Sequence, residues 1–158
     1  MIPDLRHELR QLKPSTSLQQ EAQLNLARTE AVLHAGFEQV LTPHGIGATQ
    51  YHVLRILRGA GAEGLCRNEI RDRLLTRMPD VTRLLDRMEE AGFVIRVRST
   101  EDRRLVATRL TKRGRDLVDR LDEPVAAGHQ RRLGHLTPAQ LRTLSELLTL
   151  ARHPSPDP

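Results

Sequence analysis

Closely spaced acidic and basic side chains mark one short stretch of the sequence, STEDRRLVATRLTKRG, which runs from Ser99 to Gly114. Within it Asp102 is followed directly by Arg103 and Arg104. A guanidinium group can bind a phosphate or a guanine edge through two hydrogen bonds, and side chains two residues apart on an extended backbone face the same side. The stretch therefore predicts either a solvated turn or a contact with a negatively charged partner.

Positive charge is concentrated in the same part of the chain. The 158 residues carry a formal net charge of +5, and 23 of the 25 basic residues are arginines. Residues 67–115 hold 14 basic and 8 acidic residues, so the whole positive excess lies in this block. Nucleic acid and an anionic membrane surface are both partners that such a block fits.

The elements that would position this stretch are two strands, predicted over 93–98 and 105–110 with a polar loop between them. Apolar residues at three- and four-residue steps predict helices on either side. These helices span residues 3–13, 17–42, 48–60, 67–75, 79–91, 125–134 and 137–152, with another that begins at 112. The sequence therefore predicts a mainly α fold with a small β-hairpin wing.

Local start and stop signals add detail to three of these helices. Cys66 and Glu69 form an incomplete capping box before the helix at 67–75, because cysteine caps poorly. Pro79 is expected in the first turn of its helix, where a missing N–H costs nothing. Pro124 is expected to kink or split the helix that begins at 112, since proline removes a backbone hydrogen bond.

Three short helices followed by a two-stranded hairpin describe a winged helix-turn-helix. In that arrangement the third helix enters the major groove of DNA, and the hairpin reaches the flanking minor groove or backbone. The buried face predicted for the helix at 79–91 consists of Val81, Leu84, Leu85 and Met88. Arg83 and Arg87 remain on the outer face, where they either contact DNA or form an ordinary solvated surface.

The segments Val81–Arg96, Asp102–Arg104 and Leu110–Gly114 resemble the MarR family of bacterial transcriptional regulators in residue types and spacing. The resemblance implies a homodimer that binds a pseudo-palindromic DNA site, usually as a repressor. It also implies that Arg104 enters the minor groove and that Asp102 holds it by an ion pair. The residues expected to contact DNA are Arg77, Pro79, Asp80, Thr82, Arg83, Arg87, Arg98, Asp102, Arg103 and Arg104.

The same resemblance implies a division of the chain into regions. These are an N-terminal arm (1–16), a helical dimerisation region (17–44 and 111–152), a winged helix-turn-helix DNA-binding lobe (45–110) and a flexible tail (153–158). Many relatives release DNA when a small phenolic or other organic ligand binds between the lobe and the dimerisation region. The residues that would line that cleft are His34, Phe37, Tyr51 and His52. Gly47 and Cys66 depart from the family, which commonly has a capping Ser or Thr at these positions.

Several other classes of protein are disfavoured. No segment approaches the roughly 20 apolar residues of a membrane span, and the N-terminus lacks the apolar region of a signal peptide, so we expect a cytoplasmic protein. The single cysteine excludes an intrachain disulfide, and the seven histidines lack zinc-binding spacing. No nucleotide-binding or nucleophile motif is present. We therefore expect neither enzymatic activity nor a metal or cofactor.

Two alternatives stay open. A winged-helix module for protein–protein interaction, without DNA binding, would keep the fold but replace the arginines of the wing and third helix. This chain retains Arg83, Arg103 and Arg104, which favours DNA binding. Cys66, at a predicted helix N-terminus, is either a redox sensor or a tolerated helix cap.

Overall fold

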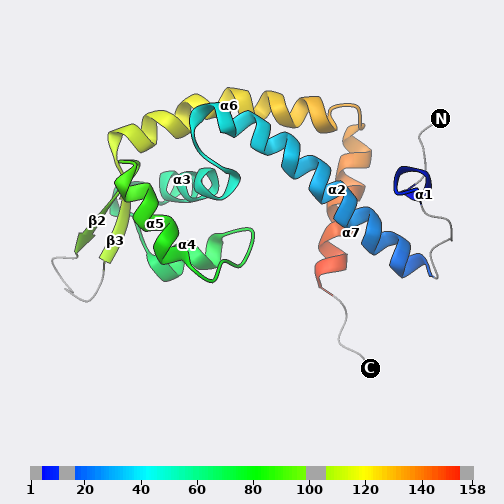
Figure 1. Ribbon diagram of the computed structural model, residues 1–158, viewed down its shortest axis with the longest axis horizontal. Coiled ribbons are helices and arrows are strands. Elements are labelled where there is room, and N and C mark those ends of the chain that lie inside the picture. Colours follow the sequence, from blue (N-terminus) through cyan, green and yellow to red (C-terminus); the bar gives the residue numbers. More distant parts are fainter. Residues whose placement is uncertain (1–4, 11–16, 99–105, 154–158) are drawn as a thin grey trace.

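The computed structural model describes residues 5–10, 17–98 and 106–153, and it shows a mainly helical protein with one small sheet (Figure 1). The elements in chain order are α1 (Leu5–Glu8), α2 (Leu18–Leu41), η1 (Thr42–His44), α3 (Ala48–Ala60), η2 (Gly61–Glu63), β1 (Leu65–Cys66), α4 (Arg67–Arg73), α5 (Val81–Glu90), β2 (Val94–Arg98), β3 (Val106–Leu110), α6 (Lys112–Leu133) and α7 (Pro138–Arg152). Helix α6 crosses the top of Figure 1, with the lobe of α3, α4, α5, β2 and β3 beneath one half of it.

Helix α2 begins where the sequence predicts, because the Ser17 hydroxyl oxygen accepts a hydrogen bond from the Gln20 N–H at 3.1 Å. Its C-terminal end joins the core through Leu41, which is fully buried. Its first turns are different, since the side chain of Leu18 is 81% exposed. In the single chain, therefore, much of α2 is an open surface.

Pro124 was expected to kink or split this helix, and the split is wrong because α6 continues through Pro124. Proline still removes one intrahelical hydrogen bond. Leu121 and Val125, which lie on either side of it in the sequence, are both buried in the core. Because packing of a buried face supplies most of the stability of a helix in a protein, these contacts compensate for the missing bond.

Helix α5 begins at Val81, two residues later than predicted. Asp80 is the N-cap, and its Oδ1 accepts a hydrogen bond from the Arg83 N–H at 3.0 Å. Pro79 therefore precedes the cap instead of lying in the first helical turn. The aspartate determines the start because its carboxylate satisfies an otherwise unpaired helical N–H.

The sheet has three antiparallel strands in the order β1-β3-β2. Strands β2 and β3 form the predicted wing, whereas β1 was not predicted. It pairs Leu65 with Thr108 and Cys66 with Ala107. Gly64 allows this close approach, because a Cβ at that position would lie 2.3 Å from the carbonyl oxygen of Thr108. Its positive φ of 72° also favours glycine.

Thr111 connects the wing to α6. Its hydroxyl oxygen accepts the Gly114 N–H at 3.0 Å and lies 2.6 Å from the carbonyl oxygen of Gly92, to which it donates. A Cβ on Gly114 would lie 2.0 Å from the carbonyl oxygen of Phe93. The segment Leu110–Gly114 thus connects the wing to α6. Thr111 caps the helix, and Gly114 allows the wing to pack closely against it.

One hydrophobic core joins α3, α4, α5 and β2 to the first half of α6. Arg58 of α3 reinforces the attachment, since its guanidinium donates to Asp119 and Asp122 of α6 at 2.8 Å. The hydrogen bond from Arg58 lowers the pKa of Asp122. The DNA-binding lobe expected from the sequence and the first half of α6 therefore share a single core.

Helix α7 begins at its predicted signal, with the Thr137 hydroxyl oxygen accepting the Gln140 N–H at 3.3 Å. None of its residues is buried in the single chain. Leu147 and Leu150 are 59% and 68% exposed. Among the helices that the structure describes, none is long and apolar enough to cross a membrane.

Candidate nucleic-acid interface

Helix α5 directs its apolar side chains into the core and its polar side chains outward. The buried residues are Val81, Leu84, Leu85 and Met88, as the sequence predicted. The described residues that we expected to contact DNA are all exposed, namely Arg77, Pro79, Asp80, Thr82, Arg83, Arg87 and Arg98. The remaining three, Asp102, Arg103 and Arg104, lie outside the described residues.

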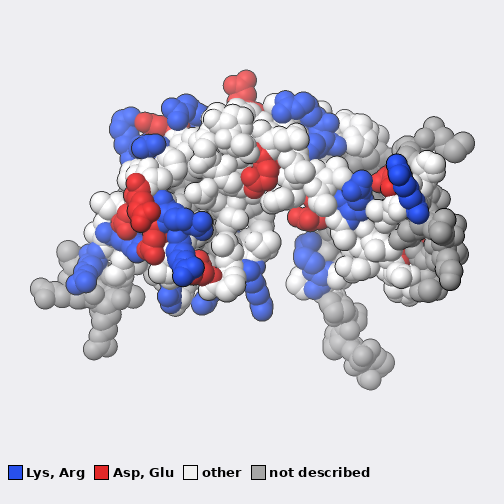
Figure 2. All heavy atoms as spheres, viewed as in Figure 1, with Lys and Arg blue, Asp and Glu red and all other residues white. Residues whose placement is uncertain are grey.

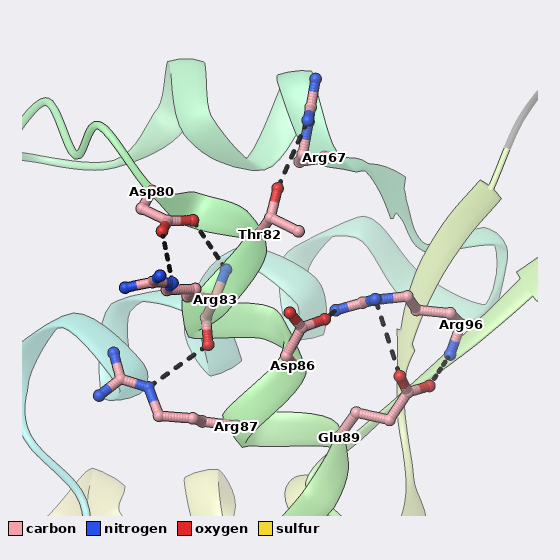
Figure 3. A network of polar contacts seen from close by, with 8 residues as sticks. All are labelled: Arg67, Asp80, Thr82, Arg83, Asp86, Arg87, Glu89 and Arg96. Atoms are coloured by element: carbon pink, nitrogen blue, oxygen red, sulfur yellow. Dashed lines mark hydrogen bonds and ion pairs between the residues drawn. The ribbon is translucent and has the colours of Figure 1, made fainter.

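Arg83 is exposed but held in place (Figure 3). Its Nε lies 3.1 Å from Oδ2 of Asp80, and its carbonyl oxygen accepts a hydrogen bond from Nε of Arg87 at 3.3 Å. The Arg83 side chain is 83% exposed, so the ion pair with Asp80 contributes little to stability. Asp80 instead orients a guanidinium group that remains available to an anion from solution.

Arg67, at the start of α4, extends the polar surface of α5. Its Nη1 donates to the hydroxyl oxygen of Thr82 at 3.4 Å (Figure 3). Sequence reasoning missed Arg67, because the two residues are brought together only by the packing of α4 against α5. Its charge, its exposure and its contact with Thr82 place it beside the residues expected to contact DNA.

A second arginine that sequence reasoning missed, Arg96 of β2, reaches from the wing to α5. It forms an ion pair with Asp86, and its Nε lies 3.7 Å from Oε2 of Glu89 (Figure 3). The Asp86 carboxylate therefore points toward the wing.

A cavity of about 390 Å³ lies between α4, α5 and the sheet. Its lining residues are Cys66, Arg67, Asn68, Thr82, Leu85, Arg96, Val106 and Thr108. Cys66 is a half-buried free thiol, and its backbone N–H donates to Oε2 of Glu69 at 2.8 Å. Glu69 thus forms its half of the expected capping box.

Basic side chains gather along the lower edge of the lobe in Figure 2, with acidic side chains between them. Part of the positive excess of residues 67–115 therefore lies on the surface that carries α4 and α5. Long-range attraction of a polyanion by such a surface depends on ionic strength.

A second cluster, of aromatic rings, lies where α2, α3 and α6 meet. The Phe37 ring stacks on His52 at a centroid distance of 5.7 Å and meets Tyr51 edge-on at 5.6 Å. His129 of α6 also stacks on Phe37, at 5.8 Å, and was not predicted. Exposed His34 lies outside these ring contacts, with its Nε2 3.8 Å from Oε1 of Glu38.

The histidines of this cluster are biased toward the neutral form. Burial, followed by the positive charges of Arg55 and His34, lowers the pKa of His52. Partial burial and the charges of Arg132 and Arg55 lower the pKa of His129. Within the described residues, no group of three or more His, Cys, Asp or Glu side chains could hold a metal ion.

Three short helices packed under a wing, with exposed arginines on the third helix, define the class of winged helix-turn-helix DNA-binding proteins. The MarR family model matches residues 46–106. The chain is 31% identical to an HTH-type transcriptional repressor of Mycobacterium tuberculosis, over 78% of this chain and 87% of that protein. It belongs to the MarR family of transcriptional regulators.

Other relatives agree with this assignment. The HTH-type transcriptional repressor IacR of Pseudomonas putida is 28% identical, over 81% of this chain and 75% of that protein. The MarR transcription factor of Planctomyces limnophilus is 41% identical, with a TM-score of 0.66 over 87% of this chain and 99% of that one. A mutant MarR of Escherichia coli, solved in complex with operator DNA, is 26% identical, with a TM-score of 0.74 over 94% and 99% of the two chains.

Proposed function

We propose that this regulator is a homodimeric repressor that binds a pseudo-palindromic operator through α5 and the wing. The observation that carries the proposal is the outer face of α5, where Arg83 is exposed and oriented by Asp80 beside the exposed Arg87. The solved complex of a related MarR with operator DNA supports this assignment. The proposed contacts are Arg77, Pro79, Asp80, Thr82, Arg83, Arg87, Arg98, Asp102, Arg103 and Arg104.

Selection from a random 30-base-pair duplex library tests this function. We expect one inverted repeat to be enriched, with an affinity for it that falls steeply as salt increases, because counterions are released on binding. A gel-shift salt series should compare the enriched duplex with a shuffled one. Equal affinity for both would contradict sequence-specific binding and favour the protein-interaction module instead.

The dimer proposal rests on apolar side chains left open in the single chain. On α2 and α7 these are Leu18, Leu26, Val32, Leu144, Leu147 and Leu150. Covering them with a second copy of the chain would remove apolar surface from water. In this proposal residues 17–44 and 111–152 form the dimerisation region, and residues 45–110 form the DNA-binding lobe. Sedimentation should give a dimer, and Leu147→Glu should shift it toward monomer. A monomeric wild type would contradict the proposal.

We further infer that a small organic ligand regulates DNA binding at the junction of α2, α3 and α6. The contacts of Phe37 with Tyr51 and His52 support this, because they join the lobe to the dimerisation helices. His34 lies one helical turn away from Phe37 along α2. A panel of phenolic compounds should be tested for displacement of a labelled operator. Release that persists unchanged in Phe37→Ala and His52→Ala would place the ligand elsewhere.

A further inference from the structure

Arg96 belongs to the basic block but points inward from β2 to α5, with 28% of its side chain exposed. Its guanidinium pairs with Asp86 and lies near Glu89, as Figure 3 shows. Its backbone N–H also donates to Oε1 of Glu89, at 2.9 Å. One wing residue is therefore held by α5 through both its side chain and its backbone.

The two carboxylates are placed for this contact by helical geometry. Asp86 and Glu89 are three residues apart, so they share one face of α5. Both are partly buried beside Arg96, where a charge-assisted hydrogen bond is stronger than on an open surface. Arg109 of β3 provides a contrast, because its Nε donates at 3.1 Å to the carbonyl oxygen of Glu63, which lies outside α5.

We propose that Arg96 is a positioning residue that fixes the angle between the wing and α5, so that both contact DNA as one rigid unit. The DNA part of this inference rests on the proposed function. Strand β2 leads from Arg96 to Arg98 and into the segment that carries Arg104, while α5 carries Arg83. If the wing and α5 are already fixed relative to each other in the free protein, the wing loses little further conformational entropy when it contacts DNA after α5 has bound.

The test compares Arg96→Met with Arg109→Met, which removes an equal charge from the other wing strand. Binding is measured to the selected operator duplex and to a shortened duplex that lacks the flanking base pairs reached by the wing. Arg96→Met should weaken binding to the full duplex about tenfold and leave binding to the shortened duplex unchanged. Arg109→Met should stay within about twofold of wild type on both.

A coupling measurement separates positioning from a direct DNA contact. Arg104→Ala should weaken operator binding strongly in the wild-type background but by less than about twofold in the Arg96→Met background. The double variant Asp86→Asn, Glu89→Gln should reproduce Arg96→Met, because it removes the same contacts from the other side. Additive losses, or an equal loss on the two duplexes, would overturn the proposal.

Hydrogen exchange provides a measurement without DNA. In Arg96→Met the amides of β2 should exchange faster while those of α5 keep their protection. Unchanged exchange in β2 would also overturn the proposal. If wild type shows no sequence preference, the proposed function fails, yet the exchange experiment still decides whether Arg96 positions the wing.

Discussion

The carboxylate of Glu38, near the end of α2, accepts a hydrogen bond at 2.7 Å from the backbone N–H of Ala48, the first residue of α3. Gly47, the N-cap of α3, has no side chain that could do this. Its own N–H donates to Oε1 of Gln50 at 2.9 Å. A carboxylate from α2 thus satisfies a backbone N–H in the first turn of α3, as the side chain of a capping serine or threonine would.

Glu38→Ala should therefore lower the free energy of unfolding by about 1 kcal/mol, the usual cost of losing an N-cap. Adding Gly47→Ser should recover part of this loss, because the extended backbone of residue 47 (φ −102°, ψ 173°) suits a capping side chain. Urea unfolding followed by circular dichroism provides the measurement, with Glu30→Ala as the control. Equal stability of Glu38→Ala and wild type would show that the cap is energetically irrelevant.

Gly114→Ala should destabilise the protein by roughly 2 kcal/mol or more, because the new methyl group would meet the carbonyl oxygen of Phe93 and force α6 away from the wing. Gly59→Ala is the matched control in α3, where a Cβ would meet nothing within 4 Å. That substitution should be stabilising by up to about 1 kcal/mol. Thermal unfolding of the two variants should shift in opposite directions. A shift in the same direction would refute the close-approach role of Gly114.

The stability of the fold should fall as the pH is lowered below about 6.5, the ordinary histidine pKa. Because the pKa values of His52 and His129 are lowered in the folded protein, the unfolded chain binds more protons between 6.5 and the folded values. The stabilisation is fully present above 6.5 and is lost as the pH falls through the folded pKa values. Urea unfolding at pH 7.5, 6.5 and 5.5 should show this loss. The double variant His52→Gln, His129→Gln should flatten the dependence, and an unchanged slope would refute it.

Arg83→Ala should weaken operator binding by about 1–3 kcal/mol, the value of one bidentate base contact, and relax the preference for one base pair. Arg104→Ala should cost a similar amount, if its guanidinium enters a narrow minor groove. Arg120→Ala, an exposed arginine of α6, is the control for loss of charge. Fluorescence anisotropy with matched and mismatched duplexes measures both effects. Losses that are equal for all three variants would indicate only non-specific attraction.

Periodic signals in the sequence were sufficient to predict most of the helices and the buried face of α5. The two-residue strand β1 was not predictable in this way, because two residues have no periodicity. A split at Pro124 was wrongly allowed for, because a local rule about proline takes no account of the core packing around Leu121 and Val125. The first turn of α5 was misjudged because capping by Asp80 outweighed the preference of Pro79 for a first helical position.

Contacts between distant segments explain the rest of what was missed. Phe37, Tyr51 and His52 could be grouped because they lie on adjacent helices of the expected fold. His129 joins them from α6, far along the chain, with no motif to mark it. The pairing of Arg96 with Asp86 was hidden in the same way, because only the packing of the sheet against α5 brings the two side chains together.

Thr111 connects the base of the wing to α6, so a tilt of α6 also moves the wing. The same hydroxyl that begins this helix holds the base of the wing, and the 22 residues of α6 then extend about 33 Å to the loop before α7. If α6 tilted by roughly 6° about its C-terminal end, its N-terminal end and the wing would move by about 3.4 Å, which is the rise of one base pair. A tilt of only a few degrees in α6 would therefore be large enough to move the wing out of register with the proposed operator.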